Sequence, residues 1–481
     1  MKTLPLVLGV LCVASLLGEA NAETPSSGST AVDVDPATLS QIRDVAMESD
    51  WAWLHLANLA DGIGPRPTGS TQLALAVTQV AEALAALGAD VKLQPVRVPH
   101  WVRGEESAEI VQVPGQPVGV SQRLHITALG TSSATPATGL TANVIIVQDF
   151  DELERKAPQV RGNIVLFASH FNQRLAENGR AGDAYLQAGK FRFRGPTAAA
   201  KLGAAAALVC SVGGANFRLP HTGATFWADK QDPIPAGALA SEDADLLVRL
   251  AARGPIRLKL VLTPATLPDA DSDNVIADWP GREYPDEYVV VSGHLDSWDL
   301  GTGATDDGVG VIGAAGVIAV LQKLNLHPRR TVRFIAWTDE ENGGRGAKEY
   351  LDSVSHNVAR QVAAIESDLG AGRALGIIAA ADKDALSFLD PVVKALAPLG
   401  ATSLQRGEHV GSDIEELQGA GVPGFSPLLD TRHYFDYHHT AADTLDKVDP
   451  ENFRTQIATM AVLAFYLAER PQTFPRVATT K

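Results

Sequence analysis

One stretch, from Tyr288 to Gly310, constrains the fold of this chain most, because it predicts a buried strand that ends in a polar, glycine-rich turn. Consecutive valines give the strand signal. His294 and Asp296 follow two residues apart, so an extended backbone directs both side chains the same way. Asp306 comes next, in a turn before an expected helix over residues 309–324. Such a unit is typical of an open α/β sheet, in which ligands bind at the carboxyl ends of the strands.

The residue types at this strand end favour a metal site. Imidazole and carboxylate groups together suit a divalent ion such as zinc. Each piece alone is more often structural, and Asp307, the second residue of an Asp-Asp-Gly turn, is expected to be so. The residues in later segments therefore determine whether this turn belongs to a metal site or is only structural.

Three later segments present the same kinds of side chain. The expected strand over residues 331–337 is followed by the paired carboxylates Glu340 and Glu341. The expected strand over residues 362–365 is followed by Asp368. Two adjacent carboxylates at a strand end point apart, so one can bind a metal while the other faces the substrate as a base. A histidine pair near the carboxyl terminus completes the set of candidate metal ligands, which are His294, Asp306, Glu341, Asp368 and His439.

The number of candidate ligands indicates two metal ions. A catalytic zinc site needs three protein ligands and a water, and five candidates exceed that requirement. Five ligands fit two metals that share one bridging carboxylate and activate an attacking hydroxide. A glycosidase with paired carboxylates is the competing enzyme class, but the two histidines argue against it.

Strands and helices alternate in the segments around these residues. Expected strands at 288–292, 331–337, 362–365 and 375–380 alternate with helices that include 384–397 and 451–469. This pattern predicts an α/β fold with a mixed, largely parallel sheet between helices. Upstream, a helix is expected from about residue 41, another over 71–87, and a strand over 89–98.

The middle of the chain differs in composition from the segments on either side. Short apolar runs with many glycines and prolines occupy residues 112–272, a helix is expected over 197–202, and residues 269–273 are expected to be a polar return linker. We interpret residues 112–272 as an inserted β-rich domain. The parts on either side, residues 41–111 and 273–481, then form one catalytic domain.

The amino terminus predicts export. Lys2, an apolar run over residues 4–17 and a small-residue pattern ending at Ala22 predict a signal peptide over residues 1–22. Residues 23–40 are expected to be a flexible leader. The apolar run is too short for a stable membrane anchor, and no other stretch is expected to span a membrane. The protein is therefore expected to be secreted or periplasmic. Cys210 remains after cleavage and is expected to be an inert core thiol, without an accompanying histidine pattern.

Charge excludes some partners. The net charge of −16 argues against nucleic acid or an anionic membrane as the main partner. Hydrophobic residues make up 45% of the chain and charged residues 20%, which is enough for a large core.

Several motifs together resemble the M28 family of co-catalytic zinc peptidases. The resemblance covers roughly residues 45–470, including an insert similar to a protease-associated domain. The matching stretches are VPHWVRGEESA (98–108), SGHLDSWD (292–299), GATDDG (303–308), WTDEENGG (337–344), ESD (366–368), AGVPG (420–424) and HHTAADT (438–444).

The resemblance implies two Zn²⁺ ions per chain and a role for each candidate ligand. His294 and Asp368 would hold one ion. Glu341 and His439 would hold the other, and Asp306 would bridge the two.

The resemblance also implies the residues around the ligands. Glu340 would be the general base, and the carboxylate of Asp296 would orient the ring of His294. His438 is the less ligand-like histidine of its pair, because the family's ligand directly precedes Thr or Ser.

The family cleaves single residues from short peptides, which makes an aminopeptidase or dipeptidase the favoured activity. A carboxypeptidase of the same fold and a non-catalytic receptor-like protein are the alternatives. The resemblance also implies a homodimer. Recognition of an amine needs a carboxylate, and recognition of a carboxylate needs a cation or a backbone nest. Candidate substrate-binding residues are Arg406, His409, Ser412, Asp413 and Tyr434, although Ser412 or Asp413 could equally cap a helix.

Overall fold

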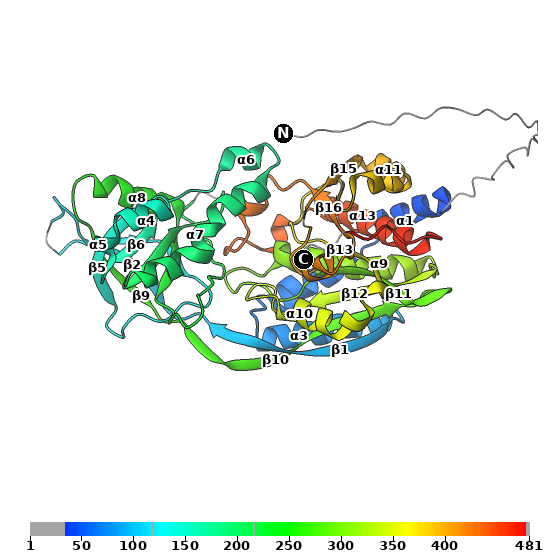
Figure 1. Cartoon of the computed structure of the whole chain (residues 1–481), viewed down its shortest axis with the longest axis horizontal. Helices are drawn as coiled ribbons and strands as arrows, with labels where there is room; N and C mark the ends of the chain where they lie inside the picture. Colours follow the sequence, from blue (N-terminus) through cyan, green and yellow to red (C-terminus); the bar gives the residue numbers. More distant parts are fainter. Residues whose placement is uncertain (1–33, 118, 215–216, 409, 478–481) are drawn as a thin grey trace, which may run out of the picture. The chain divides into compact units, whose positions relative to one another are not determined.

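Two eight-stranded sheets organise the protein (Figure 1). The structure is a computed structural model, and it describes residues 34–117, 119–214, 217–408 and 410–477. The expected signal peptide and most of the expected leader lie outside the described residues. The described residues from Val34 onward form one unit.

The first sheet carries the residues that the sequence singles out. Strands β12, β11, β13 and β16 are parallel neighbours, while β10 and β14 run antiparallel to β12 and β16. The sheet is therefore mixed and mostly parallel, as expected. Its strands, in spatial order, are β1 (Asp90–Val102), β10 (Ala265–Trp279), β12 (Arg330–Trp337), β11 (Tyr284–His294), β13 (Gln361–Glu366), β16 (Gly424–Leu429), β14 (Ala374–Ala380) and β15 (Ser403–Arg406).

Helices cover both faces of this sheet because its central strands are apolar on both sides. Val289 and Val291 pack into the larger core, and Val290 between them packs into the core on the opposite face. The larger core contains residues of α1 (Pro36–Glu48), α2 (Trp51–Ala57), α3 (Thr71–Ala86), α9 (Val309–Lys323), α11 (Asp390–Leu396) and α13 (Pro450–Glu469). The opposite core contains residues of α10 (Arg345–Val354) and α12 (Glu415–Gly419).

The second sheet is a single insertion into the first. All of its strands lie between Glu106 and Leu262, so the chain leaves the first sheet after β1 and returns with β10. Its strands, in spatial order, are β3 (Gln122–Leu124), β2 (Glu106–Gln112), β9 (Arg257–Leu262), β5 (Leu140–Val147), β6 (Ile164–Phe167), β7 (Ala206–Cys210), β8 (Ala236–Leu239) and β4 (Ile126–Ala128). Its helices are α4 (Phe150–Arg155), α5 (Ala157–Val160), α6 (Gln173–Glu177), α7 (Ala181–Lys201) and α8 (Ser241–Ala251).

The edges of the insertion differ from the expected ones at residues 112 and 272. Strand β2 already belongs to the second sheet, and β10 begins before the expected boundary. The expected linker, Asp269–Asp273, is therefore wrong, because it lies within β10 and pairs with β1. Its acidic side chains suit an exposed edge of the sheet, where Asp271 forms an ion pair with Arg97. The identity of the insertion as a protease-associated domain stays a prediction.

Two helices also begin earlier than expected. Helix α1 starts at Pro36 and includes the last five residues of the expected leader, since Asp35 caps it and Pro36 suits the first turn. The helix expected at 197–202 is the end of the much longer α7. Pro196 inside α7 cannot donate to the carbonyl of Arg192, and the hydroxyl of Thr225 donates to that carbonyl instead.

The helix that follows the site, α9, consists almost entirely of small and apolar residues. By length and composition, the segment Ala304–Lys323 is long and apolar enough to cross a membrane, so the expectation that no such stretch follows the amino terminus was wrong. Every residue of its most apolar window is buried inside the protein. The segment is therefore accounted for as a core helix.

Candidate metal centre

The turn between β11 and α9 places the first candidate ligands. His294 is the last residue of β11, and Asp306 and Asp307 precede α9. The carboxylate of Asp307 accepts hydrogen bonds from the backbone N–H of His294 (3.2 Å) and of Gly310 (3.1 Å). These bonds tie the strand end to the start of the helix, in agreement with the structural role expected of Asp307.

The first group of ligand atoms gathers around His294. Its Nε2 lies 3.4 Å from Oδ1 of Asp306 and 3.5 Å from Oδ1 of Asp368. The ligand atoms of these three residues all lie within 4.8 Å of one another, which is close enough for one ion to contact all of them.

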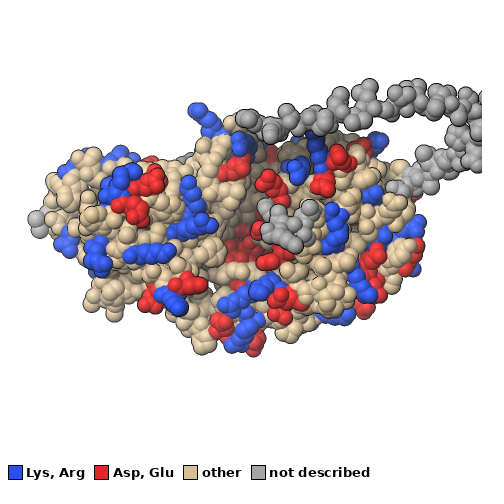
Figure 2. Space-filling view, in the orientation of Figure 1, with Lys and Arg blue, Asp and Glu red and all other residues tan. Residues whose placement is uncertain are grey.

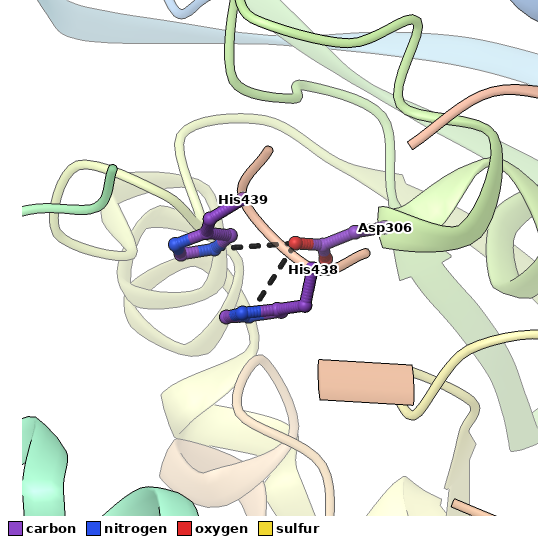
Figure 3. Close-up of side chains that lie close together, drawn as sticks. All are labelled: Asp306, His438 and His439. Carbon is purple, nitrogen blue, oxygen red and sulfur yellow. Dashed lines mark ion pairs between the residues drawn. The ribbon is translucent and has the colours of Figure 1, made fainter. Parts of the chain in front are cut away.

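The second group gathers on the other oxygen of Asp306. Nε2 of His439 lies 3.2 Å from Oδ2 of Asp306 and 3.1 Å from Oε2 of Glu341. Nε2 of His438 lies 3.5 Å from the same Oδ2 (Figure 3). Asp306 thus presents one oxygen to each group, which is the arrangement that a bridging carboxylate requires.

The two adjacent histidines differ in their surroundings. Their rings stack with centroids 3.6 Å apart, and both point toward Asp306 (Figure 3). His439 also forms an ion pair with Glu341, at 3.1 Å. Burial and the neighbouring His439 lower the pKa of His438 well below its usual range, which favours the neutral form of its ring. The sequence-based preference for His439 as the ligand stays a prediction, and His438 is a close neighbour of the same oxygen.

The hydrogen bonds behind the rings fit a bound cation. Nδ1 of His294 lies 2.9 Å from the backbone carbonyl of Asp296, and Nδ1 of His439 lies 3.2 Å from that of Thr222. The tautomer that donates from Nδ1 to these carbonyls has a lone pair on each Nε2, facing carboxylate oxygens; Nη1 of Arg192 also lies 3.3 Å from Nδ1 of His439. Two acceptors at such distances repel unless a cation lies between them. Among the described residues, Oδ2 of Asp306 and Oε1 of Glu341 are also buried without a hydrogen-bond partner.

The pKa shifts of the two histidines also favour a bound cation. Burial lowers the pKa of His439, but the carboxylates of Glu341 and Asp306 outweigh it and raise that pKa to about 9. Burial is likewise outweighed at His294, whose pKa is raised well above its usual value by Asp306 and Asp368. The carboxylates therefore attract positive charge to both rings, and a divalent metal can replace the protons.

Asp296 acts differently from the expectation. Its carboxylate lies 3.9 Å from Nδ1 of His294, and the backbone carbonyl of Asp296 is the closer partner of that ring. The carboxylate accepts from the backbone N–H of Glu340 (3.2 Å), from that of Glu341 (3.3 Å) and from the hydroxyl of Thr68 (2.9 Å). Asp296 therefore holds the backbone of the paired glutamates, because its position at the strand end puts both N–H groups within reach.

Glu340, the expected base, lies in an acidic environment. Burial raises the pKa of its carboxyl well above the usual value, and Asp368 and Glu341 raise it further, while His294 lowers it. A carboxyl with a raised pKa can accept and return a proton near neutral pH.

Some of the expected substrate-binding residues lie beside the predicted metal ligands or their neighbours, and others do not. Ser412 donates to Oδ2 of Asp368 at 3.3 Å, and the ring of Tyr434 packs 5.1 Å from that of His438. Asp413 is buried, and its backbone N–H donates to Glu366 at 3.3 Å. Arg406 is exposed on β15, and its guanidinium donates to the backbone carbonyl of Ala381, which is not a site residue. His409 lies outside the described residues.

Sequence reasoning missed residues that support the site. The indole N–H of Trp298 donates to Glu341, and the buried guanidinium of Arg66 donates to the carbonyls of Leu295, Thr302 and Gly303. Trp298 lies within a motif quoted above, which was the available signal. Thr222 gives no such signal, because its contact runs through a backbone carbonyl.

Cys210 has a histidine partner that the sequence did not indicate. Its Sγ lies 3.4 Å from Nδ1 of His170, whose Nε2 lies 3.0 Å from Asp245. Burial nevertheless raises the pKa of the Cys210 thiol to about 12. A buried, protonated thiol is a poor nucleophile, which supports the expectation of an inert cysteine.

Comparisons with known proteins identify the family of this chain. The model of peptidase family M28 matches residues 274–464, the segment that contains all five candidate ligands. The chain is 38% identical to carboxypeptidase Q of Homo sapiens over 427 residues, which cover 88% of this chain and 86% of the human protein. The chain belongs to peptidase family M28. It is a metallo-exopeptidase of that family.

Solved structures extend the comparison to the M28 fold. A peptidase M28 precursor from Shewanella amazonensis SB2B is 33% identical, with a TM-score of 0.86 over 92% of this chain and 99% of that one. A zinc aminopeptidase from Bacillus subtilis is 21% identical, with a TM-score of 0.62 over 88% of this chain and 95% of that one. The second likeness shows the fold alone, and it covers the second sheet as well as the first.

Proposed function

We propose that this M28 peptidase is a two-zinc exopeptidase that cleaves dipeptides or short peptides. The observation that carries the proposal is Asp306, whose two oxygens face two separate groups of ligand atoms. His294 and Asp368 would hold one ion, and Glu341 and His439 would hold the other. When bound, zinc makes a water available as a nucleophile near neutral pH and polarises the peptide carbonyl.

The protein's own residues supply the proton transfers. Glu340 takes the proton of the attacking water and returns it to the leaving amine. Its raised pKa suits both steps, because the carboxyl must hold the proton between them. The bonds from Asp296 to the N–H groups of Glu340 and Glu341 keep the base and its neighbouring ligand in a fixed relation.

The charge of the site favours a substrate with a free amino end. Figure 2 shows acidic side chains in the floor of a hollow near the centre of the view. Glu366 and Asp413 add further buried carboxyls close to the predicted ligands. Carboxyl oxygens beyond those that would hold the two ions can accept hydrogen bonds from an α-ammonium group, so we favour an aminopeptidase or dipeptidase. A carboxypeptidase is the second candidate, because that activity is in the name of the human relative.

The cellular location and assembly belong to the proposal as well. The pattern over residues 1–22 supports export to the periplasm or the medium. The homodimer implied by the family resemblance is part of the same proposal.

A panel of dipeptides tests the substrate end. Each dipeptide is offered to zinc-loaded protein in free, N-acetylated and C-amidated form. Cleavage that survives amidation and stops on acetylation indicates an aminopeptidase, and the reverse indicates a carboxypeptidase. Loss in both cases indicates a strict dipeptidase. Absence of cleavage by protein that holds two metals would refute the proposal.

Replacement of the base tests the mechanism. Glu340→Gln keeps the size of the side chain but cannot take a proton, so we expect turnover to fall by roughly 10²–10⁴-fold with metal content unchanged. Glu349→Gln on the exposed side of α10 is the matched control and should keep full activity. A metal-loaded Glu340→Gln variant with normal turnover would exclude Glu340 as the base.

A further inference from the structure

A segment of the insertion, residues 221–225 between β7 and β8, contacts the histidine pair directly. The backbone N–H of Thr222 donates to the carbonyl of His439 at 2.9 Å, and Nδ1 of His439 lies 3.2 Å from the carbonyl of Thr222. Nδ1 of His221 lies 2.8 Å from the carbonyl of His438. The insertion thus fixes both the backbone position and the ring orientation of His439.

Thr222 is itself anchored within the protein. Its hydroxyl donates to the carbonyl of Ala128 at 2.8 Å and accepts from the guanidinium of Arg103 at 3.1 Å. The same guanidinium donates to both oxygens of Asp299, at 2.7 and 2.8 Å. A bidentate arginine–carboxylate pair is strong and directional. The Arg103–Asp299 pair therefore connects the loop after β11 to residues 221–225, the segment that contacts His439.

Trp298 makes a second connection, next to Asp299 on the same loop. Its indole N–H donates to Glu341, while its ring packs into the core of the second sheet. The ring meets Trp101 edge-on at 6.3 Å and lies so close to Gly130 that a side chain there would overlap it. The position of Glu341 therefore depends on packing that the insertion provides.

The other predicted ligands have supports of a different origin. The ring of His294 is oriented by the carbonyl of Asp296, and Asp368 accepts from Ser412. These partners belong to the first sheet and its loops. Within the described part of the chain, these contacts to one predicted metal position come from the first sheet and its loops, and those to the other come also from the insertion.

We propose that Trp298 and Thr222 are positioning residues through which the insertion sets the affinity of one metal position, the one held by Glu341 and His439. The affinity of the position held by His294 and Asp368 does not depend on this packing. The inference rests on the proposed two-zinc function.

Metal binding to a Trp298→Phe variant tests the proposal. Phenylalanine keeps an apolar ring but removes the donor to Glu341. Apo protein is titrated with zinc against a chromophoric chelator, which measures each equivalent without reference to activity. We expect one equivalent to bind roughly 10–100-fold more weakly and the other to be unchanged. Trp279→Phe is the matched control, because the buried indole of Trp279 on β10 donates to the carbonyl of Leu326, away from the ligands.

Each outcome decides the inference. Unchanged binding of both equivalents, equal weakening of both, or the same effect in Trp279→Phe would overturn it. If Trp298→Phe fails to fold, Asp299→Asn replaces it, since it loosens the pair with Arg103 without touching a ligand. The same selective loss is then expected. Wild-type protein that binds only one zinc would overturn the two-zinc function as well, whereas active wild type with two zincs and an insensitive variant would overturn this inference alone.

Discussion

Replacement of Asp296 by asparagine would separate the observed role of this residue from the expected one. Its carboxylate accepts three hydrogen bonds, from the backbone N–H groups of Glu340 and Glu341 and from the hydroxyl of Thr68. The side chain is fully buried. Asparagine keeps one acceptor oxygen and turns an N–H₂ group toward one of these donors. One buried N–H is then left unpaired, and the remaining bonds lose their charge assistance.

The magnitude follows from these contacts. An unpaired buried donor costs about 1–3 kcal/mol, and a bond to a charged group is worth about 1 kcal/mol more than one to a neutral group. We therefore expect Asp296→Asn to lower the free energy of unfolding by about 3 kcal/mol. The same change should weaken zinc binding at the Glu341 position, because that backbone is no longer held.

Urea unfolding of the apo protein, followed by tryptophan fluorescence, measures the stability change, and zinc titration measures the metal effect. Asp352→Asn is the control, since Asp352 is exposed and forms its ion pair with Lys348 on the surface of α10; its effect should stay below about 0.5 kcal/mol. Selective weakening of the metal held by His294, with stability unchanged, would refute this reasoning. It would show that the carboxylate of Asp296 acts on the ring.

Two further predictions concern the insertion. Since burial raises the pKa of Cys210 to about 12, iodoacetamide at pH 8 should label the native protein far more slowly than the urea-unfolded protein; equal rates measured by mass spectrometry would contradict the buried state. Burial lowers the pKa of His221 to about 3 in the native protein. As the pH falls below about 6.5, the imidazole of His221 therefore gains a proton in the unfolded chain but not in the native protein. Stability should therefore be lost as pH falls from 6.5 toward 3, by up to about 1.4 kcal/mol per pH unit from this residue. His221→Asn should make urea midpoints of the apo protein fall less steeply in that range, and an unchanged slope would exclude this contribution.

The strands that carry the site were predictable because their signals are local. An apolar strand followed by His294, or by the pair Glu340 and Glu341, places these residues at one edge of a parallel sheet. Helix α9 and strand β12 follow the expected ranges closely for the same reason. In contrast, α7 was mostly missed, because Pro196 and several glycines hide its periodicity and a hydroxyl from elsewhere in the chain compensates for the proline.

The sequence by itself determined which residue types stand at the strand ends, and hence the mostly parallel sheet and the set of metal-ligand candidates. Only the tertiary structure decided how these residues are held. It showed that each oxygen of Asp306 faces a different ligand group and that a backbone carbonyl, not a carboxylate, orients His294. It also showed that Thr222, far away in the sequence, supports His439. The physical reason is that backbone groups are the same at every residue, so their long-range hydrogen bonds leave no pattern in the sequence.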